Sequence, residues 1–324
     1  MLNIGIMCGG FSSEYDISIK SAKNVLKNIS KVKYNPFLIY VKPNKWEVEY
    51  LGEVYDFSQS TMSFQYKADT IQLDAAHIYI HGNPGENGKL QAYLEMKNIP
   101  CINSGALSSE LSFDKWFCNQ FLKNFNIPIA QSILLLSKSE LDTDKVVQEL
   151  GLPCFIKPSD SGSSYGISKV YNIDELERAV DIAFEEGERV VIEAFLKGIE
   201  VTCAVYKTLD GINTLPCTEI VSHKDFFDYE AKYNGLSEEI TPARISIDLS
   251  NKIQILSQNI YKLLQLKSIA RIDFMIVNDI PHVIEVNTIP GFSNESIVPK
   301  MLAVADIPVS LFWDEIYAFE LNQH

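Results

Sequence analysis

The chain has 324 residues, 46% of them hydrophobic and 22% charged, which is the composition of a globular protein with large apolar cores. Its formal net charge of −14 argues against a nucleic-acid or anionic-membrane surface, although a local basic cleft for a small phosphate ligand stays possible. No apolar run reaches the ~20 residues of a membrane span, and the N-terminus lacks the basic region of a signal peptide, so we expect a cytoplasmic protein with no membrane partner.

The first 105 residues alternate between predicted strands and helices. The apolar segment LNIGIMC (2–8) indicates a buried strand, and the sequence after it has the apolar spacing of an amphipathic helix. Further strands are predicted at 35–41, 75–80 and 99–103, and a further helix at 88–98. This alternation predicts a doubly wound parallel sheet, because parallel strands need a crossover helix between them.

The middle of the chain predicts an α+β unit. Its expected elements are a helix at 114–125, a strand at 132–136, a helix near 142–150, a strand at 153–157 and a helix at 173–187. The last helix is amphipathic, and we expect it to turn Leu176, Ala179, Ile182 and Ala183 inward. Before it lies the glycine- and serine-rich loop PSDSGSSYG (158–166).

A third portion begins near residue 199. Strands are predicted at 199–207 and 214–221, a helix at 248–265, and a helical tail at the C-terminus. Residues 226–243 have no predicted structure, and a loop of that length in a compact domain is usually a lid or a disordered segment. Its aromatic side chains favour a lid that closes over a ligand.

Six cysteines are scattered through the sequence without a CxxC pair. Most of them lie in apolar segments, so we interpret them as reduced core residues rather than as metal ligands or nucleophiles. They are Cys8, Cys101, Cys118, Cys154, Cys203 and Cys217.

The segment IARIDFMIVNDIPHVIEVN (269–287) predicts two apolar strands joined by a tight turn, with polar residues in both strands. Because side chains alternate between the faces of a strand, the turn decides which polar residues meet. A turn at 278–280 would place these residues opposite one another: Val277 and Pro281, Asp273 and Glu285, and Arg271 and Asn287. A two-residue turn without a bulge would instead put the two acids on opposite faces.

Two carboxylates that face each other across such a hairpin have Cβ atoms ~5 Å apart and repel by roughly 3 kcal/mol at an effective dielectric of ~20. A shared proton, the Arg271 guanidinium or a divalent cation could compensate for this repulsion. Two carboxylates and an amide oxygen suit Mg²⁺, which completes its shell with water and phosphate. The hairpin alone therefore leaves a metal site and a salt bridge around Arg271 equally open.

A second group of residues favours the metal site. Lys157 ends a predicted strand directly before the loop 158–166, whose backbone N–H groups and hydroxyls can bind phosphate oxygens. The loop is not a Walker motif, because GxxxxGK[ST] does not occur in the sequence, and most Gly/Ser loops are plain turns. A lysine, this loop, two strand acids and an aromatic lid together indicate a nucleotide and metal site.

Several separated segments, in this order, resemble the D-alanine–D-alanine ligases of the ATP-grasp superfamily over nearly the whole chain. They are GGFSSEYDISIKSA (9–22), HGNPGENGKLQAYLE (81–95), NSGALSSELSFDK (103–115), PCFIKPSDSGSSYGISKV (153–170), FFDYEAKY (226–233) and ARIDFM…IEVNTIPGFSNESIVP (270–299). The resemblance implies a mixed α/β and α+β chain with three-domain ATP-grasp architecture. Its expected domains are residues 1–104 with the parallel sheet, 105–197, and 198–324 with the metal and transfer site.

The activity that the resemblance implies is the ATP-dependent ligation of two D-alanines through an acyl phosphate, for peptidoglycan precursor synthesis. ATP would be a co-substrate, two Mg²⁺ or Mn²⁺ ions would be cofactors, and the active form would be a homodimer. The implied metal ligands are Asp273, Glu285 and Asn287. The implied catalytic residues are Glu14, Ser163, Tyr233, Arg271 and Gly291, with Arg271 and the Gly291 N–H at the developing oxyanion.

Other roles carry over from matching positions. The implied substrate-binding residues are Glu14, His81, Arg271 and Ser296, with Glu14 at the first ammonium and Ser296 at the second carboxylate. The implied ATP-binding residues are Lys115, Lys157, Ser163, Ser164, Glu193, Phe195, Leu196, Glu200 and Lys232.

Each of these residues also has an ordinary structural interpretation when it is taken alone. Glu14 would be a first-turn helix charge, and His81 a turn residue. Ser296 would be a helix cap, and Glu200 a solvated strand edge. Lys115 would be a surface pair with Asp114.

Three alternatives to the ligase stay open at this point. A sister ligase could use D-lactate or D-serine as second substrate, although Tyr233 stands where the lactate-using relatives have a histidine. A catalytically silent nucleotide-binding module could have the same fold, although it would be expected to lose hairpin acids. A third possibility is an ATP-grasp enzyme that joins a different acid and amine.

Overall fold

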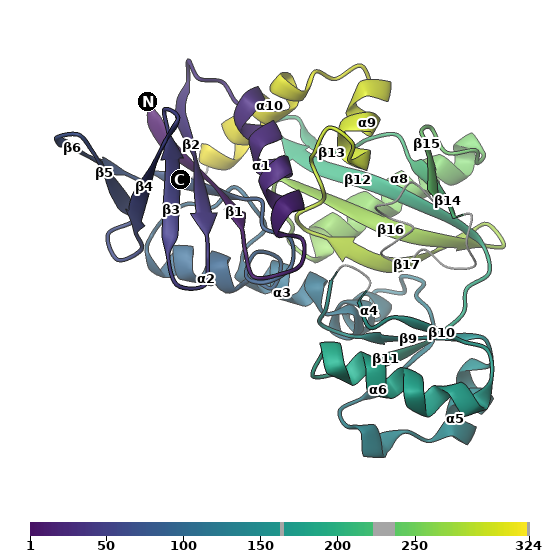
Figure 1. The fold of residues 1–324 in the computed structure, drawn as a ribbon. Coiled ribbons are helices and arrows are strands. Elements are labelled where there is room, and N and C mark those ends of the chain that lie inside the picture. Colours follow the sequence, from purple (N-terminus) through teal and green to yellow (C-terminus); the bar gives the residue numbers. More distant parts are fainter. Residues whose placement is uncertain (163–164, 223–236, 323–324) are drawn as a thin grey trace.

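The computed structural model describes residues 1–162, 165–222 and 237–322, and within these ranges the strands form three sheets (Figure 1). In Figure 1 the second sheet and its helices extend below the other two. The three sheets correspond in chain order to the three portions of the sequence.

The first sheet is mixed, with the strand order β6-β5-β4-β3-β2-β1-β7. Its parallel strands are β1 (Leu2–Gly9), β2 (Tyr34–Val41) and β7 (Ala75–Ile78), as predicted. Its antiparallel strands, which were not predicted, are β3 (Trp46–Tyr50), β4 (Glu53–Ser58), β5 (Ser63–Tyr66) and β6 (Asp69–Gln72). The predicted strand at 99–103 is wrong, since this segment makes only a single bridge between Cys101 and Ala76.

Helices from both ends of the chain share the apolar core of this sheet. They include α1 (Tyr15–Asn28) and α2 (Lys89–Met96) from the N-terminal portion, and α10 (Val309–Leu321) from the C-terminal tail. Trp313 and Tyr317 of α10 are fully buried in the same cluster as Ile4 and Ile6 of β1. The C-terminal helix therefore ties the last portion of the chain to the first sheet.

The second sheet is antiparallel, with the order β10-β9-β11-β8. Its strands are β8 (Ser132–Leu135), β9 (Cys154–Pro158), β10 (Ser168–Val170) and β11 (Val190–Ala194). The helices before and around it are α3 (Ala106–Phe113), α4 (Lys115–Lys123), α5 (Thr143–Leu150) and α6 (Leu176–Glu186), with short 3₁₀ turns at Lys138–Glu140 and Ile173–Glu175.

Helix α6 corrects one expectation about its inward face. Leu176, Ala179 and Ala183 are buried as predicted, but Ile182 is 38% exposed and Val180 is buried instead. Positions 176, 179, 180 and 183 form a single i, i+3, i+4, i+7 stripe, and residue 182 lies beside that stripe.

The third sheet contains the predicted hairpin and has the main order β15-β14-β12-β16-β17, with β13 beside β12. Its strands are β12 (Ile199–Thr208), β13 (Gly211–Thr214), β14 (Thr218–Ser222), β15 (Ser237–Ile240), β16 (Ile269–Val277) and β17 (Ile280–Asn287). Its helices are α8 (Ile247–Leu263) and α9 (Ile297–Val304). Strand β15 lies inside the segment 226–243 that was predicted to lack structure, so that prediction is wrong for these residues.

The hairpin has the predicted pairing of its acids but a different turn. Asn278 and Asp279 form a two-residue turn with φ values of 50° and 60°, and Val277 pairs with Ile280 rather than with Pro281. The register then shifts by one residue at a β-bulge between Asp273 and Phe274, so Asp273 still faces Glu285. The extra residue that the sequence suggested for the turn is therefore in β17.

Two expectations about the whole chain can be compared with the described residues. All six cysteines lie in these ranges and are free, and all except the half-buried Cys101 are buried. None of the helices in the described ranges combines the length and the apolar character needed to cross a bilayer.

Candidate active site

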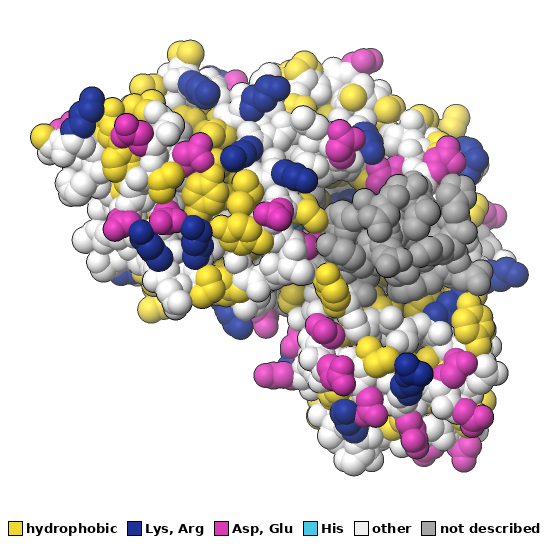
Figure 2. Space-filling view, in the orientation of Figure 1, with side chains coloured by type: hydrophobic (Ala, Val, Ile, Leu, Met, Phe, Trp, Pro, Cys, Tyr) yellow, Lys and Arg dark blue, Asp and Glu magenta, His cyan; other side chains and the backbone are white. Residues whose placement is uncertain are grey.

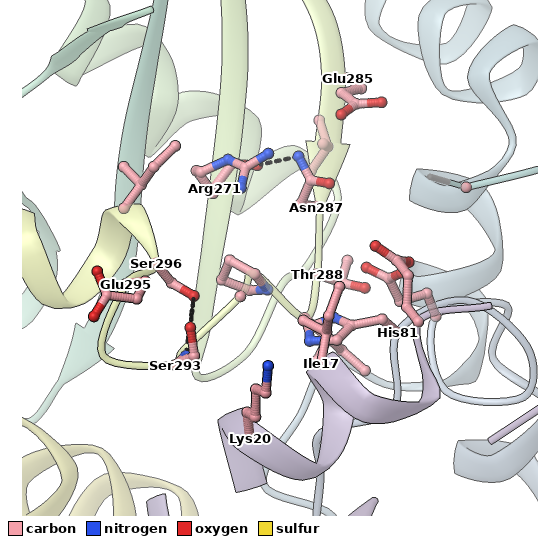
Figure 3. Close-up of a pocket in the computed structure, with 18 of the residues that line it drawn as sticks. Ile17, Lys20, His81, Arg271, Glu285, Asn287, Thr288, Ser293, Glu295 and Ser296 are labelled. Carbon is pink, nitrogen blue, oxygen red and sulfur yellow. Dashed lines mark hydrogen bonds between the residues drawn. The ribbon is translucent and has the colours of Figure 1, made fainter. Parts of the chain in front are cut away.

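A cavity of about 810 Å³ lies between helix α1, the hairpin β16–β17, and the loop that leads from β17 into α9 (Figure 3). Residues from the N-terminal and C-terminal portions line it together. The predicted site residues that line this cavity are Glu14, His81, Lys115, Arg271, Glu285, Asn287, Gly291 and Ser296.

Asp273 accepts hydrogen bonds on both of its carboxylate oxygens. Its Oδ1 accepts hydrogen bonds from Thr202 Oγ1 at 2.5 Å and Arg271 Nε at 2.9 Å. Its Oδ2 accepts from an Arg271 terminal nitrogen at 2.7 Å and from Asn287 Nδ2 at 3.0 Å. The carboxylate is only 8% exposed, so the bidentate pair with Arg271 compensates its charge in this structure.

Arg271 is held in its charged form. Burial alone would lower the pKa of its guanidinium, but attraction and hydrogen bonding by Asp273, with a further attraction from Glu285, raise that pKa above its ordinary value. Two of its five N–H groups bond to Asp273, so donors remain for a ligand in the cavity.

The two acids of the hairpin face each other in register, and Arg271 forms its bidentate ion pair with Asp273. Glu285 lines the cavity, and Figure 3 shows its carboxylate pointing away from the Arg271 guanidinium. Asn287 follows on the same strand and also lines the cavity. Glu285 therefore presents its charge to the cavity while Asp273 is held behind it.

The donor set of the hairpin fits a hard divalent cation. It comprises two carboxylates, Asp273 and Glu285 in register, and the amide of Asn287 two residues further along β17. Carboxylate and amide oxygens are the ligands that Mg²⁺ and Mn²⁺ prefer. No group of three or more His, Cys, Asp or Glu side chains in the described ranges has the geometry of a metal site, so an ion here would depend on the amide and on non-protein ligands.

Glu14 and His81 lie at the ends of neighbouring parallel strands. Glu14 follows β1 and is 7% exposed, and His81 follows β7 and is 6% exposed. Ser12 joins the two segments, since its hydroxyl donates to the His81 carbonyl at 2.7 Å and accepts from the Glu14 N–H at 3.3 Å. The carboxyl ends of parallel strands are where α/β sheets usually bind ligands.

Ser296 occupies the N-cap position of α9, yet its side chain makes no capping bond. Its hydroxyl instead accepts a hydrogen bond from the Ser293 N–H at 3.0 Å and lies 2.9 Å from the Ser293 hydroxyl (Figure 3). A Cβ added at Gly291 would lie 3.0 Å from Ser296 Oγ, so glycine allows this close approach. The loop thus presents a pair of hydroxyls and backbone groups to the cavity.

Lys115 is the first residue of α4 and is not a simple surface partner of Asp114. Its ammonium donates to the Ser161 carbonyl at 2.6 Å, and burial lowers its pKa. Asp114 caps α4 and forms an ion pair with Arg189 at 2.8 Å. Lys115 therefore fixes the start of the loop 158–166 against the cavity.

Other predicted ATP-binding residues lie on the second sheet and its edge, outside the lining of this cavity. Lys157 and Glu193 form a buried ion pair at 2.6 Å between neighbouring strands β9 and β11. The Lys169 ammonium lies 4.1 Å from the ring centre of Phe195. Leu196 and Glu200 are half-buried, Leu196 between β11 and β12 and Glu200 within β12.

Four predicted residues lie outside the described ranges. They are Ser163, Ser164, Lys232 and Tyr233.

Sequence reasoning missed several residues that shape the site. Thr202 bonds to Asp273 across the β12–β16 ladder, where their residues pair directly. Lys169 follows the Gly/Ser loop, and it reaches the ring of Phe195, which is distant in sequence. Lys20 of α1 also lines the cavity, as does Ser293. The polar face of α1, opposite its apolar stripe, could have indicated Lys20.

Comparison with known proteins shows that the chain is similar to D-alanine–D-alanine ligases. A family model described as the D-ala D-ala ligase N-terminus matches residues 3–104, and the model for the C-terminus matches residues 121–312. A D-alanine–D-alanine ligase of Azobacteroides pseudotrichonymphae is 44% identical over 98% of this chain and 99% of its own. One from Bacteroides fragilis is 41% identical over 95% of each chain.

Solved structures agree in fold. A D-alanine–D-alanine ligase of Bacillus anthracis has a TM-score of 0.82 at 32% identity, covering 99% of this chain and 98% of that one. The VanG D-Ala:D-Ser ligase of Enterococcus faecalis has a TM-score of 0.88 at 30% identity, covering 98% and 99%. The Bacillus anthracis enzyme complexed with ATP has a TM-score of 0.78 at 29% identity, covering 99% and 98%.

Proposed function

Because the chain belongs to the D-alanine–D-alanine ligase family, we propose that it uses ATP to join two D-alanines into D-alanyl-D-alanine, a precursor of peptidoglycan. The observation that carries this proposal is the shared cavity. It brings a buried acid at the start of α1, Glu14, together with Arg271, Glu285 and Asn287 from the hairpin, and Ser296.

The first half-reaction would activate the donor D-alanine. Glu14 binds the ammonium of this D-alanine, with His81 beside it. The carboxylate of the D-alanine attacks the γ-phosphorus of ATP to form an acyl phosphate and ADP. Lys115 and Lys157, with Ser163, Ser164 and Lys232, bind phosphate oxygens. The work of the protein is to position these groups and to neutralise their charge.

Asp273, Glu285 and Asn287 would hold two Mg²⁺ or Mn²⁺ ions, which when bound neutralise phosphate charge. The fit rests on their oxygen donors and on the register of the two acids. For Asp273 to act as a ligand, one of the hydrogen bonds it now accepts must be released. We expect the hydrogen bonds from Arg271 to be released, because the Arg271 guanidinium is itself needed at the oxyanion in the cavity.

The second half-reaction would transfer the acyl group. The amine of the second D-alanine attacks the acyl carbonyl, and phosphate leaves. The free N–H groups of Arg271 and the backbone N–H of Gly291 stabilise the tetrahedral oxyanion. Ser296 binds the carboxylate of the second D-alanine. Tyr233, with Ser163 and Glu14, positions the first D-alanine.

The nucleotide base and ribose would lie at the edge of the second sheet. Glu193, Phe195 and Leu196 would contact the adenine, and Glu200 would bind the ribose hydroxyls. The support is their succession at the end of β11 and the start of β12, beside the buried Lys157–Glu193 pair. Lys169 over the Phe195 ring belongs to the same edge.

The proposal includes a domain division into residues 1–104, 105–197 and 198–324, a homodimeric enzyme, and a cytoplasmic location where ATP is available. The three sheets support the division, although α10 returns to the first core. Light scattering of the purified protein tests the dimer, and cell fractionation tests the location.

The deciding experiment measures phosphate release from ATP and Mg²⁺ with a panel of D- and L-amino acids, D-lactate and D-serine, and identifies the products by mass spectrometry. D-alanine alone should support turnover and yield the dipeptide. Preferential formation of a mixed product with D-serine or D-lactate would replace the proposal by a sister ligase. ATP binding without turnover on any amine would indicate a silent module. The curated relatives at 40–44% identity favour the D-alanine ligase over these alternatives.

A further inference from the structure

Three exposed lysines of α1 line the cavity and are not used by the proposed mechanism: Lys20, Lys23 and Lys27. Among its described basic residues, Arg271 is bound to Asp273 and Lys115 to the Ser161 carbonyl. Lys20 on α1 also lines the cavity and has no ion-pair partner within the described ranges. Figure 3 shows its side chain rising from α1 into the cavity. Figure 2 shows basic side chains gathered over this helix.

Helix α1 is fixed to the loop opposite Lys20 by two hydrogen bonds. Asn24 Nδ2 donates to the Phe292 carbonyl at 2.8 Å, and the Phe292 N–H donates to Ser21 Oγ at 3.1 Å. The two bonds hold both backbone groups of one loop residue, so the helix and the loop form one wall. Lys20 directly precedes Ser21 and lies one turn before Asn24, on the same face.

The next loop residue beyond this attachment is Ser293. Its hydroxyl lies 2.9 Å from the Ser296 hydroxyl, and both residues line the cavity beside Lys20. Glu295 of the same loop points away from Lys20 in Figure 3. The cavity wall therefore combines two hydroxyls and an ammonium, which together suit a carboxylate.

Resting on the proposed function, we infer that Lys20 is a positioning residue that binds the carboxylate of the second D-alanine together with Ser293 and Ser296. Hydroxyls alone would supply hydrogen bonds without a counter-charge, and a charge-assisted hydrogen bond from an ammonium is about twice as strong as a neutral one. Lys20 does not touch the reacting amine or the acyl carbonyl. Its effect therefore falls on binding of the acceptor rather than on the rate of transfer.

The test compares Lys20→Met with Lys20→Arg and with Lys31→Met. Lys31 is an exposed lysine just after α1 that is not among the cavity residues, so its replacement removes the same charge at a distance. Dipeptide formation is followed at saturating ATP over a wide D-alanine range, which separates the KM of the first site from that of the second. D-alaninamide, an acceptor without a carboxylate, is assayed beside D-alanine.

Lys20→Met should raise the KM of the second D-alanine by about 10- to 100-fold, the size expected for the loss of one charge-assisted hydrogen bond, with kcat within about threefold. Lys20→Arg should recover most of this loss, and Lys31→Met should stay within about twofold of the parent. The KM of D-alaninamide should not respond to Lys20→Met. The thermal unfolding midpoint of each variant shows that it is folded.

Two results would overturn the inference while leaving the ligase intact. One is an acceptor KM that Lys20→Met leaves within about twofold, and the other is an equal rise for D-alanine and D-alaninamide. A parent enzyme that forms no dipeptide would overturn the proposed function, and the inference with it. The two failures are thus distinguishable from the parent's product alone.

Discussion

At the scale of single residues, the hairpin depends on how Asp273 is surrounded. Its two oxygens accept four hydrogen bonds, two of them from Arg271, in a setting where only 8% of the residue is exposed. A buried ion pair contributes little net stability compared with apolar packing, but removal of one partner leaves the other charge uncompensated. Arg271 would then be the stranded group.

Replacement of Asp273 by asparagine should therefore affect both folding and turnover. We expect the free energy of unfolding to fall by about 3–5 kcal/mol, because the buried guanidinium loses its counter-charge, and we expect turnover to fall by at least about 100-fold. Urea unfolding and the phosphate-release assay measure the two effects.

Glu285→Gln is the matched control, since it removes the same charge from the facing strand and leaves the Arg271–Asp273 pair in place. It should lower turnover comparably with a clearly smaller loss of stability. Near-normal turnover of both variants at saturating Mg²⁺ would contradict the assignment of the hairpin acids.

At the scale of elements, the hairpin sets the position of its acids through its turn and its bulge. Asn278 and Asp279 have positive φ values, the geometry of the short turn that matches the twist of antiparallel strands. The bulge beside Phe274 then advances β17 by one residue. Without that shift Glu285 would not face Asp273.

Asp279 gives a direct test of the turn. Asp279→Val should lower the free energy of unfolding by about 1–2 kcal/mol, because a β-branched side chain is strained at a φ of 60°. Asp279→Gly, the matched replacement, should be tolerated because glycine adopts positive φ without strain. Equal stability of the two variants in urea unfolding would rule out the turn geometry as the cause.

The sequence predicted the parts of the fold that depend on local pattern. The pairing of Asp273 with Glu285 was correct because period-two alternation fixes which side chains can share a face. The location of the extra residue was wrong, since the spacing of the acids counts residues but does not say whether the surplus lies in the turn or in a strand. Strands β3–β6 were missed because they are short, with four to six residues each, and because no helices separate them.

The site was predictable where a residue belongs to a recognisable motif. Glu14, Arg271, Glu285 and Ser296 do meet in one cavity. Thr202 and Lys20 escaped, because their roles arise from contacts between segments distant in sequence. Thr202 becomes relevant only through the β12–β16 ladder, and Lys20 only through the attachment of α1 to the Phe292 loop.

At the scale of the whole molecule, a buried histidine connects the first sheet to the C-terminal helix. His77 of β7 has its Nδ1 atom 2.7 Å from the hydroxyl of Tyr317 in α10, and its ring lies 4.9 Å from those of Tyr79 and Trp313, centre to centre. Burial lowers the pKa of His77 to about 3. The folded protein therefore keeps this ring neutral well below pH 6.

Because of this histidine, the free energy of unfolding should decrease as the pH is lowered. Between the ordinary pKa of about 6.5 and the folded value of about 3, the unfolded chain binds a proton that the folded chain does not. The free energy of unfolding should thus be fully retained above about pH 6.5 and should decrease by up to about 1.4 kcal/mol per unit as the pH falls through this window.

His77→Asn should have a lower free energy of unfolding at pH 7, because it loses ring packing, but a shallower decline toward pH 4. Urea unfolding at several pH values measures the slope. His282→Asn, on the half-buried surface of the hairpin, is the comparison variant. An unchanged slope in His77→Asn would exclude this histidine as the source.

The attachment of Ser21 and Asn24 to Phe292 has a consequence for protein engineering. Consider a hybrid that takes its first 104 residues from one ligase and the remainder from another. It would combine α1 of one enzyme with the Phe292 loop of the other. Its acceptor preference would belong to neither parent. Exchange of the first helix together with the segment 288–296, as a single cassette, is the graft that should carry that preference across intact.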